Sequence, residues 1–203
     1  MEFQGFPKIP RLSREMIISE KLDGTNAQIF ITEDGEMLAG SRTRWITPED
    51  DNYGFAQWVK ENRAELCKLG FGRHFGEWWG QGIQRNYGLK EKRFSLFNVE
   101  RWADDAVRPA CCHVVPELYR GQFNTNIIEL ELDLLRTDGS KAAPGFLKPE
   151  GIIIFHTAAN MGFKKTLDKD EQPKSIPGLI TALADLSAVC WAVRSSVLVR
   201  NRF

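Results

Sequence analysis

The sequence predicts an α+β fold with much antiparallel sheet, and two kinds of segment predict it. Short apolar runs rich in β-branched residues, such as Met16–Ser19, Ala27–Thr32 and Ile152–His156, are bounded by turn residues and are typical of strands. Apolar residues recur at helical spacing in Tyr53–Leu69, and a second helix is expected over Asn126–Leu135, where acidic residues alternate with leucines and isoleucines. This mixture, without internal repeats, is typical of an α+β domain.

Turn residues indicate where the expected strands and helices begin and end along the chain. Asp23-Gly24 is the expected bend between the first two strands, and Gly70 ends the helix expected over 53–69. A glycine-containing loop, 80–89, is expected to join two later strands. The remaining strands are expected from Met37 onward and at 73–79, 93–99 and 163–167.

The composition is that of a globular protein with no net charge. The chain has 203 residues, of which 42% are hydrophobic, with 27 Lys and Arg against 27 Asp and Glu. Zero net charge does not exclude a nucleic-acid partner, because charge can be segregated locally. Between Lys60 and Arg101 there are nine Lys and Arg against five Asp and Glu, so this region is the better candidate for a phosphate-facing surface.

The sequence also predicts a cytoplasmic protein without a membrane span. Its four cysteines form no CxxC pair and suggest no disulfide framework. The first residues, MEFQGFPKIPRL, lack the apolar core of a signal peptide. The most apolar run, Ile176–Val199, is interrupted by Asp185 and Arg194 and is too broken for a span.

One lysine stands in an unusual context, in SEKLDGTNAQIF, where Lys21 lies between Glu20 and Asp23 just before the bend. A free lysine is a weak nucleophile at neutral pH because it is protonated. Burial or nearby cations favour its neutral, nucleophilic form, and Lys164-Lys165 could supply such cations. The pattern alone leaves open a solvated turn lysine. The sequence contains neither a GxxxxGK[ST] phosphate loop nor a GxGxxG after a strand.

KLDGTN resembles the nucleophile motif of the covalent nucleotidyltransferases, which include ATP- and NAD-dependent polynucleotide ligases and mRNA capping enzymes. In that superfamily the lysine attacks the α-phosphate of a nucleotide and forms a lysyl–NMP phosphoramidate. Five further segments resemble the superfamily's other motifs in their usual order, so that the resemblance covers Ser19–Leu167. They are Ser41-Arg42-Thr43, 76–80 with Gly82-Ile83-Gln84, 94–99, 149–154 and 162–167.

Within the superfamily, Thr25-Asn26 and Gly82-Ile83-Gln84 look most like phage-type ATP-dependent RNA ligases that seal nicks in duplex RNA. The resemblance implies an ATP-grasp-like ligase adenylation domain of antiparallel sheets with flanking helices, over residues 1–172. It implies ATP as substrate, Mg²⁺ as the metal with Mn²⁺ as an alternative, and RNA, as a nicked duplex, as the partner. RNA repair is the biological role that such an activity suggests.

The resemblance also implies roles for nine residues. Lys21 is the expected nucleophile, and Glu77, Phe97 and Glu150 are expected to bind the ribose, stack on the base and hold the metal. Arg42 is expected to contact the 3′-OH strand or the phosphates. Glu20 and Asn26 are expected at the nucleotide, and Lys164 and Lys165 at the phosphates.

Adjacent residues of a strand point to opposite faces, so we expect only one of Lys164 and Lys165 to reach the phosphate, and we favour Lys164. The other candidates have structural alternatives. Glu77 could form a buried salt bridge, and Phe97 could belong to the core. Glu150 could be a turn carboxylate. Likewise, Arg42 could be a solvated charge and Asn26 a turn-capping amide.

Residues 173–203 are expected to form an apolar helical tail in place of an OB-fold or other full C-terminal domain. Ser175 and Pro177 are suited to the first turn of a helix, and the segment after them is apolar on nearly every side. The tail therefore either packs on the domain or binds a partner or a second copy. Two alternatives to the RNA ligase stay open, a DNA ligase or GTP-dependent capping enzyme, and a non-catalytic RNA-end-binding module.

Overall fold

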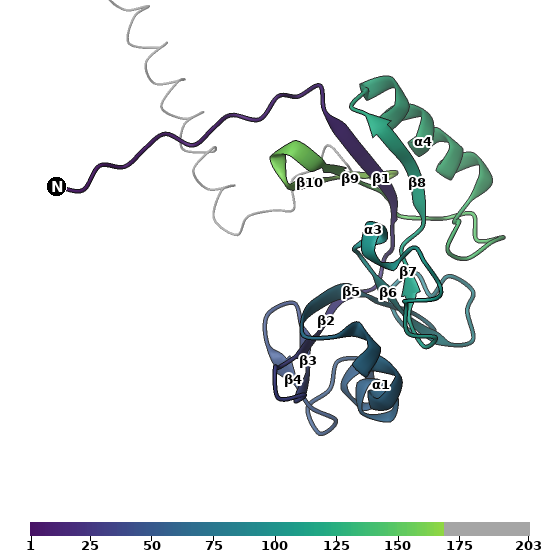
Figure 1. Cartoon of the computed structure of the whole chain (residues 1–203). Helices are drawn as coiled ribbons and strands as arrows, with labels where there is room; N and C mark the ends of the chain where they lie inside the picture. The colour runs from purple at the N-terminus through teal and green to yellow at the C-terminus, as the bar shows by residue number, and fades with distance from the viewer. Residues whose placement is uncertain (169–203) are drawn as a thin grey trace, which may run out of the picture. The chain divides into compact units, whose positions relative to one another are not determined.

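Two β-sheets joined by a continuous chain form the part of the protein that the computed structural model describes, residues 1–168 (Figure 1). The first sheet has four antiparallel strands in the order β10-β9-β1-β8, and helix α4 packs on one of its faces. These elements are β1 (Glu15–Lys21), β8 (Glu117–Gln122), α4 (Thr125–Asp138), β9 (Gly151–His156) and β10 (Met161–Thr166).

The second sheet has six strands in the order β4-β3-β2-β5-β6-β7. All neighbouring strands are antiparallel except β6 and β7, which are parallel. Its strands are β2 (Thr25–Ile31), β3 (Met37–Ser41), β4 (Trp45–Ile46), β5 (Gly72–Gly80), β6 (Lys92–Leu96) and β7 (His113–Val114). The predicted α+β class with antiparallel sheets and flanking helices is thereby confirmed.

The prediction of a single helix over residues 53–69 is wrong. The chain forms α1 (Phe55–Glu61), α2 (Arg63–Leu66) and the 3-10 helix η1 (Cys67–Leu69) instead. The break is at Asn62, whose backbone N–H and side-chain amide both donate to the Trp58 carbonyl, at 3.0 and 2.9 Å. An asparagine that bonds locally in this way competes with continuation of the helix.

The strand expected over 93–99 is also too long. It ends at Leu96, and Val99 begins the short helix α3 (Val99–Trp102). Asn98 is the N-cap, because its side-chain oxygen accepts the N–H of Arg101 at 3.0 Å. A second 3-10 helix, η2 (Thr157–Ala159), separates β9 from β10.

The first two strands do not form a hairpin, because β1 belongs to the four-stranded sheet and β2 to the six-stranded sheet. The chain crosses between the sheets at Leu22–Gly24. A Cβ atom on Gly24 would lie 2.4 Å from the Trp78 carbonyl oxygen and 2.7 Å from Cβ of Trp79. Only glycine lets the chain pass so close to β5.

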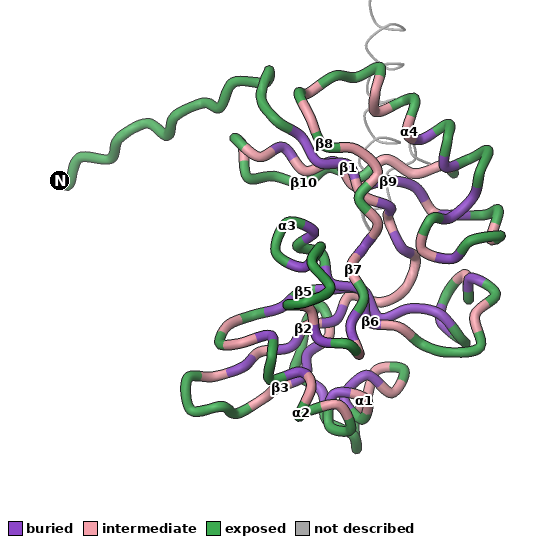
Figure 2. Tube along the Cα trace, turned by 45° about the vertical axis from the view of Figure 1, so that its right-hand side comes forward, coloured by how far each residue is buried: buried purple, intermediate pink, exposed green. Residues whose placement is uncertain are grey.

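Three groups of buried apolar residues hold these layers together. One lies between the six-stranded sheet and the α1 region and includes Ile29, Phe55 and Trp78. Another lies between the four-stranded sheet and α4. The third joins residues of both sheets, among them Ile17 of β1 and Trp79 of β5. Successive residues of β1 are therefore buried on opposite faces of its sheet, Ile17 on one face and Met16 and Ile18 on the other, as strand geometry requires. Figure 2 shows the buried run of this strand.

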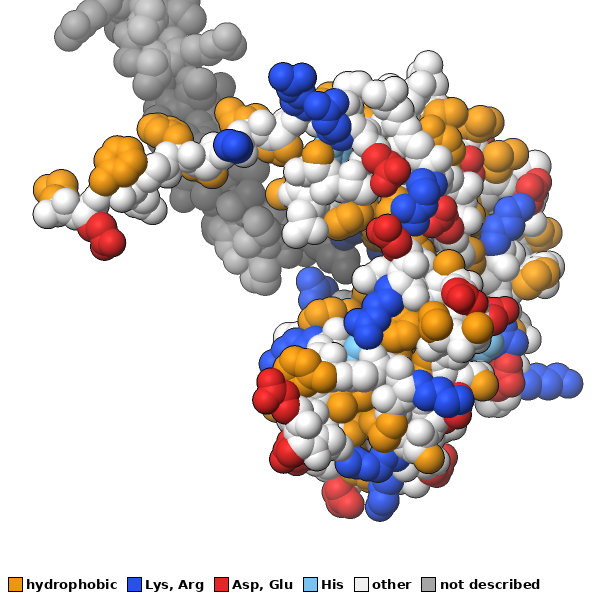
Figure 3. All heavy atoms as spheres, viewed as in Figure 1, with side chains coloured by type: hydrophobic (Ala, Val, Ile, Leu, Met, Phe, Trp, Pro, Cys, Tyr) orange, Lys and Arg blue, Asp and Glu red, His pale blue; other side chains and the backbone are white. Residues whose placement is uncertain are grey.

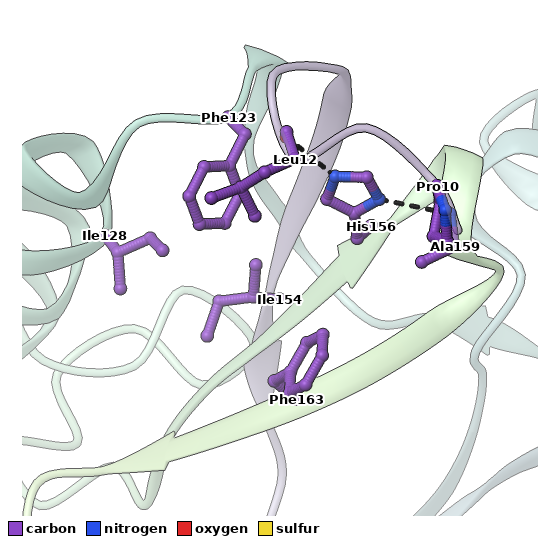
Figure 4. Close-up of a pocket in the computed structure, with 8 residues that line it drawn as sticks. All are labelled: Pro10, Leu12, Phe123, Ile128, Ile154, His156, Ala159 and Phe163. Atoms are coloured by element: carbon purple, nitrogen blue, oxygen red, sulfur yellow. Dashed lines mark hydrogen bonds between the residues drawn. The ribbon is translucent and has the colours of Figure 1, made fainter.

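The N-terminal arm, residues 1–14, is exposed along its length (Figure 2). Figure 3 shows hydrophobic side chains near its free end that protrude into solvent. It meets the four-stranded sheet at Leu12, whose carbonyl oxygen lies 2.8 Å from Nε2 of His156. An apolar pocket of about 300 Å³ lies there (Figure 4). Its lining consists of Pro10, Leu12, Phe123, Ile128, Ile154, His156, Ala159 and Phe163.

Two expectations concern the end of the chain. The boundary at residue 172 and the helical tail over 173–203 lie outside the described residues and remain predictions. Across residues 1–168, no helix combines the length and the apolar character needed to cross a membrane.

Replacing Gly151 by alanine tests how tightly β9 and β10 are joined. Gly151 has a φ of 154°, and a Cβ there would lie 2.2 Å from the Lys165 carbonyl oxygen. We expect Gly151→Ala to lower the free energy of unfolding by at least about 2 kcal/mol, measured by urea denaturation. The matched control is Gly162→Ala in β10, where the nearest atom is 4.0 Å from the added Cβ. Equal denaturation midpoints for the two variants would contradict this account.

Candidate functional site

Lys21 ends β1 beside the start of β9, and this places it against Glu150. The Cα of Lys21 pairs with that of Gly151, directly after Glu150. Lys21 Nζ lies 2.5 Å from Glu150 Oε2, and the two side chains are 23% and 18% exposed. The ion pair is therefore held in place by two adjacent strands and is still exposed enough to contact a ligand.

Glu77 is the second carboxylate of the site, and its partners come from the KLDGTN segment. The N–H of Gly24 donates to Oε1 at 3.0 Å, and the side-chain amide of Asn26 donates to Oε2 at 2.9 Å. Asn26 and Glu77 are direct partners on β2 and β5. The structure therefore brings Glu77 and Asn26 together near the lysine, and their expected contact with the nucleotide remains a prediction.

Burial decides the protonation behaviour of Glu77, which is only 7% exposed. Loss of solvent raises the pKa of its carboxyl to about 7, although the hydrogen bonds from Gly24 and Asn26 and the charge of Lys21 oppose the shift. Glu150 lies near enough for its negative charge to contribute to the rise. The two carboxylates and Lys21 form one electrostatic cluster.

Two residues that bind the crossing at Leu22–Gly24 were not predicted from the sequence. They are Arg85 and Tyr87. Arg85 Nε donates to Asp23 Oδ2 at 2.9 Å, and its guanidinium also donates to the carbonyl of Lys148 at 3.1 Å. It links the bend after Lys21 to the segment before Glu150. The Tyr87 hydroxyl accepts the N–H of Asp23 at 2.8 Å, and burial raises the pKa of that hydroxyl. No pattern in the 80–89 loop distinguishes these two residues from their neighbours.

The two lysines of β10 lie on opposite faces of the four-stranded sheet. Lys164 pairs with Ile153, which pairs with Ser19, so Lys164 shares a face with Ser19 and Lys21. Lys165 shares the other face with Ile152, and its Nζ lies 2.5 Å from Glu129 of α4. This arrangement supports Lys164 as the lysine that faces the site.

Glu20 occupies the face of β1 opposite Lys21. Its side chain is 1% exposed, and Oε2 accepts the backbone N–H groups of Lys141 and Ala142 at 2.8 and 2.9 Å. Burial raises the pKa of this carboxyl. Its contacts anchor the segment that leads to Glu150, while the expected contact with the nucleotide remains a prediction.

Phe97 and Arg42 both lie at the surface. Phe97 follows β6, is 43% exposed and donates its N–H to the Phe75 carbonyl at 3.0 Å. A ring so exposed is available for stacking, and this argues against the alternative that Phe97 is core. Arg42 lies in the exposed turn between β3 and β4, where the Ser41 hydroxyl bonds the backbone of Arg44.

The residues from 1 to 168 contain no group of three or more His, Cys, Asp or Glu that could hold a metal by themselves. The site offers instead a partly exposed carboxylate, Glu150. That fits a cation such as Mg²⁺, which is often bound through one or two carboxylates together with substrate phosphates. The apolar pocket of Figure 4 is not part of this site, because Ile154 and Phe163 face α4.

The raised pKa of Glu77 predicts how stability depends on pH. From about pH 4.5 to about pH 7 the folded protein retains a proton on Glu77 that the unfolded chain has released, so stability falls as pH rises. Glu77→Gln, which cannot titrate at this position, is the reference. The free energy of unfolding of the wild type minus that of this variant should fall by on the order of 2 kcal/mol between about pH 5 and about pH 8. Urea denaturation at several pH values measures it. Parallel pH curves for the two proteins would show that Glu77 titrates normally.

Two comparisons relate this chain to known proteins. A family model described as RNA ligase matches residues 14–168. Solved structures of an RNA ligase from Naegleria gruberi share the fold. A mutant without ligand is 20% identical, with a TM-score of 0.57 over 76% of this chain and 50% of that one. A mutant with ATP and Mn is 19% identical, with a TM-score of 0.59 over 81% and 53%.

At this identity the solved structures establish the fold, and the chain spans about half of their length. The family match covers every segment on which the resemblance to RNA ligases rests, from Lys21 to the lysines of β10. The predicted resemblance is therefore confirmed, and the chain belongs to the RNA ligase family.

Proposed function

We propose that this protein is an ATP-dependent RNA ligase that joins 3′-OH and 5′-phosphate RNA ends through AMP bound to Lys21. The observation that carries the proposal is the convergence of Lys21, Glu150 and Glu77, with the Lys21–Glu150 pair at 2.5 Å and Glu77 bonded to the bend after the lysine. Membership of the RNA ligase family supports the choice of acceptor.

The reaction has three steps. The Lys21 amine attacks the α-phosphorus of ATP, a phosphorus–nitrogen bond forms, and pyrophosphate leaves. A 5′-phosphate oxygen of RNA then attacks the same phosphorus, so that AMP passes to the RNA and the lysine is released. Finally a 3′-OH loses its proton and attacks the 5′-phosphate, AMP leaves, and a phosphodiester remains.

The Lys21–Glu150 pair has two consequences for the first step. An amine must lose a proton before it can attack phosphorus, and the Glu150 carboxylate lies within hydrogen-bond distance of that proton. The pair also fixes the direction of the lysine side chain before ATP binds. Solved N. gruberi ligase structures contain ATP or AMP with Mn, which supports ATP and a divalent cation here, Mg²⁺ or Mn²⁺. A cation at Glu150 would neutralise charge on the phosphates.

Glu77 and Phe97 suit the nucleoside part of ATP. A buried carboxylate that already accepts two hydrogen bonds keeps acceptor capacity for ribose hydroxyls. The exposed Phe97 ring can stack on the base. Lys164, on the face of Lys21, would stabilise charge on the phosphates, and Arg42 would contact the 3′-OH strand. The wider proposal comprises a nicked RNA duplex as substrate, a role in RNA repair, a cytoplasmic location, and a protein partner or second copy bound through residues 173–203.

Covalent labelling tests the first step. The protein is incubated with Mg²⁺ and ATP labelled at the α-phosphate, and denatured protein is analysed on a gel. We expect label on the wild type and none on Lys21→Ala, because Lys21 is the amine that lies against Glu150. The matched control is Lys68→Ala, which removes a surface lysine paired with Glu65 and should keep the label. Label that persists on Lys21→Ala would refute the assignment.

The same assay separates the alternative functions. GTP in place of ATP tests a capping-type enzyme, and sealing of nicked DNA against nicked RNA tests a DNA ligase. A wild type that takes no label from ATP, GTP or NAD would favour a non-catalytic RNA-end-binding module.

The two lysines of β10 give a paired prediction. We expect Lys164→Ala to slow label formation by about 100-fold or more, as loss of a charge stabiliser does. Lys165→Ala should stay within about threefold of the wild type, because Lys165 faces α4 and pairs with Glu129. Initial rates of labelling measure both. Equal losses, or a larger loss for Lys165→Ala, would contradict the assignment of faces.

A further inference from the structure

One face of the six-stranded sheet carries aromatic residues and an arginine that the reaction described above does not use. Cross-strand pairing sets Gln28 opposite Phe75 and Gly40, and Phe30 opposite Arg73. Gly40 in turn pairs with Trp45. Paired residues lie on the same face of a sheet. We call this set the open face, and its members are Gln28, Phe30, Gly40, Trp45, Arg73 and Phe75.

The open face is exposed, and it lies opposite the core. The alternate residues Ile29 and His74 are buried on the α1 side, whereas Phe75 is 52% and Trp45 44% exposed. Arg73 is exposed as well. Large aromatic rings left in water at neighbouring positions are uncommon unless they bind something.

Several side chains of the open face contact one another. The guanidinium carbon of Arg73 lies 4.6 Å from the centre of the Phe30 ring and 5.2 Å from that of Trp45. Its NH1 donates to Gln28 Oε1 at 3.1 Å. A Cβ on Gly40 would lie 3.0 Å from Trp45 Cε3, so glycine lets the indole lie close across the strand.

The charge of the open face selects among ligands. None of its six members is acidic, and Arg73 takes part in none of the ion pairs found within residues 1–168. An arginine held against aromatic rings retains its positive charge and N–H donors for a phosphate. Aromatic rings beside such an arginine are the combination that binds unpaired nucleotides, whose bases stack and whose backbone is anionic.

The open face is continuous with the candidate site. Phe75 lies beside Phe97, since the Phe97 N–H donates to its carbonyl. Glu77 is two residues further along β5 on the same side, and Arg73 is four residues from Glu77, about 13 Å along the strand. A nucleic-acid strand that ends at Lys21 and Glu77 can therefore continue over the open face.

We propose that the open face binds unpaired nucleotides of the RNA whose end is to be joined, with bases on Phe75 and Trp45 and a phosphate on Arg73. The inference rests on the proposed RNA ligase function and extends it to an RNA-binding surface outside the nucleotide site. It differs from the wider proposal in one respect, because the RNA end bound here is single-stranded and not part of a nicked duplex. The bases stack and the guanidinium pairs with phosphate, so binding adds no covalent step.

The test compares Trp45→Ala and Arg73→Ala with two matched controls. Phe71→Ala removes a ring that is 61% exposed and precedes β5, and Arg63→Ala removes an exposed arginine of α2. Affinity for a short fluorescent single-stranded RNA is measured by anisotropy at several salt concentrations. Label transfer from ATP is measured on the same preparations, because it needs no RNA.

We expect each open-face variant to bind the RNA at least about fivefold more weakly than the wild type, and the controls to bind normally. Arg73→Ala should also reduce the slope of log affinity against log salt by about 0.7. Both variants should take label from ATP at the wild-type rate, which shows that they are folded.

Two results would overturn the inference while leaving the ligase assignment intact. The first is a wild type that takes label and seals RNA, with variants that bind RNA as it does. The second is a dimer in sedimentation that Trp45→Ala converts to monomer without change in RNA affinity, which would make the open face a protein interface. Failure of the proposed function looks different, since the wild type itself would then take no label.

Discussion

The passage of the chain between two sheets at Leu22–Gly24 is the constraint on which the site depends. Lys21 is the last residue of β1, and four residues later the chain is already in β2 of the other sheet. The Tyr87 hydroxyl, the Arg85 guanidinium and the Glu77 carboxylate each bond the backbone or side chain of this short crossing. Because the crossing cannot shift without breaking these bonds, the lysine is held against Glu150 before any ligand arrives.

Strand alternation then divides the residues near Lys21 between two environments. Ser19, Lys21 and Lys164 share the face toward the site, while Glu20 and Lys165 share the face that α4 covers. The buried Glu20 carboxylate binds the backbone at Lys141 and Ala142, and Lys165 binds Glu129. Glu20 and Lys165 are each adjacent in sequence to a lysine on the site face, Lys21 and Lys164. They nevertheless make their contacts on the opposite face, which α4 covers.

Much of this arrangement could be predicted from the sequence, and the remainder could not for physical reasons. The β-branched runs predict the strands. The resemblance of the KLDGTN and 76–80 segments to ligase motifs gives the expectation that Lys21, Asn26 and Glu77 serve one site, and the structure places Asn26 beside Glu77. The break of the first helix at Asn62 escaped prediction, because apolar spacing continues through it while a local side-chain bond ends the helix. Arg85 and Tyr87 escaped because their partners are more than sixty residues away in the chain.

The two site carboxylates illustrate how environment, not residue type, assigns chemistry. Glu150 is partly exposed and lies 2.5 Å from the Lys21 amine, so its carboxylate is accessible to a ligand. Glu77 is buried, and its raised pKa leaves it protonated part of the time near neutral pH. A protonated Glu77 can donate to an oxygen as well as accept from a hydroxyl, so it can bind a ribose in either state. In the proposed function, Glu150 holds the metal ion that binds the phosphates. The proposed separation of nucleoside from phosphate chemistry thus depends on placing one glutamate in β5 and the other directly before β9.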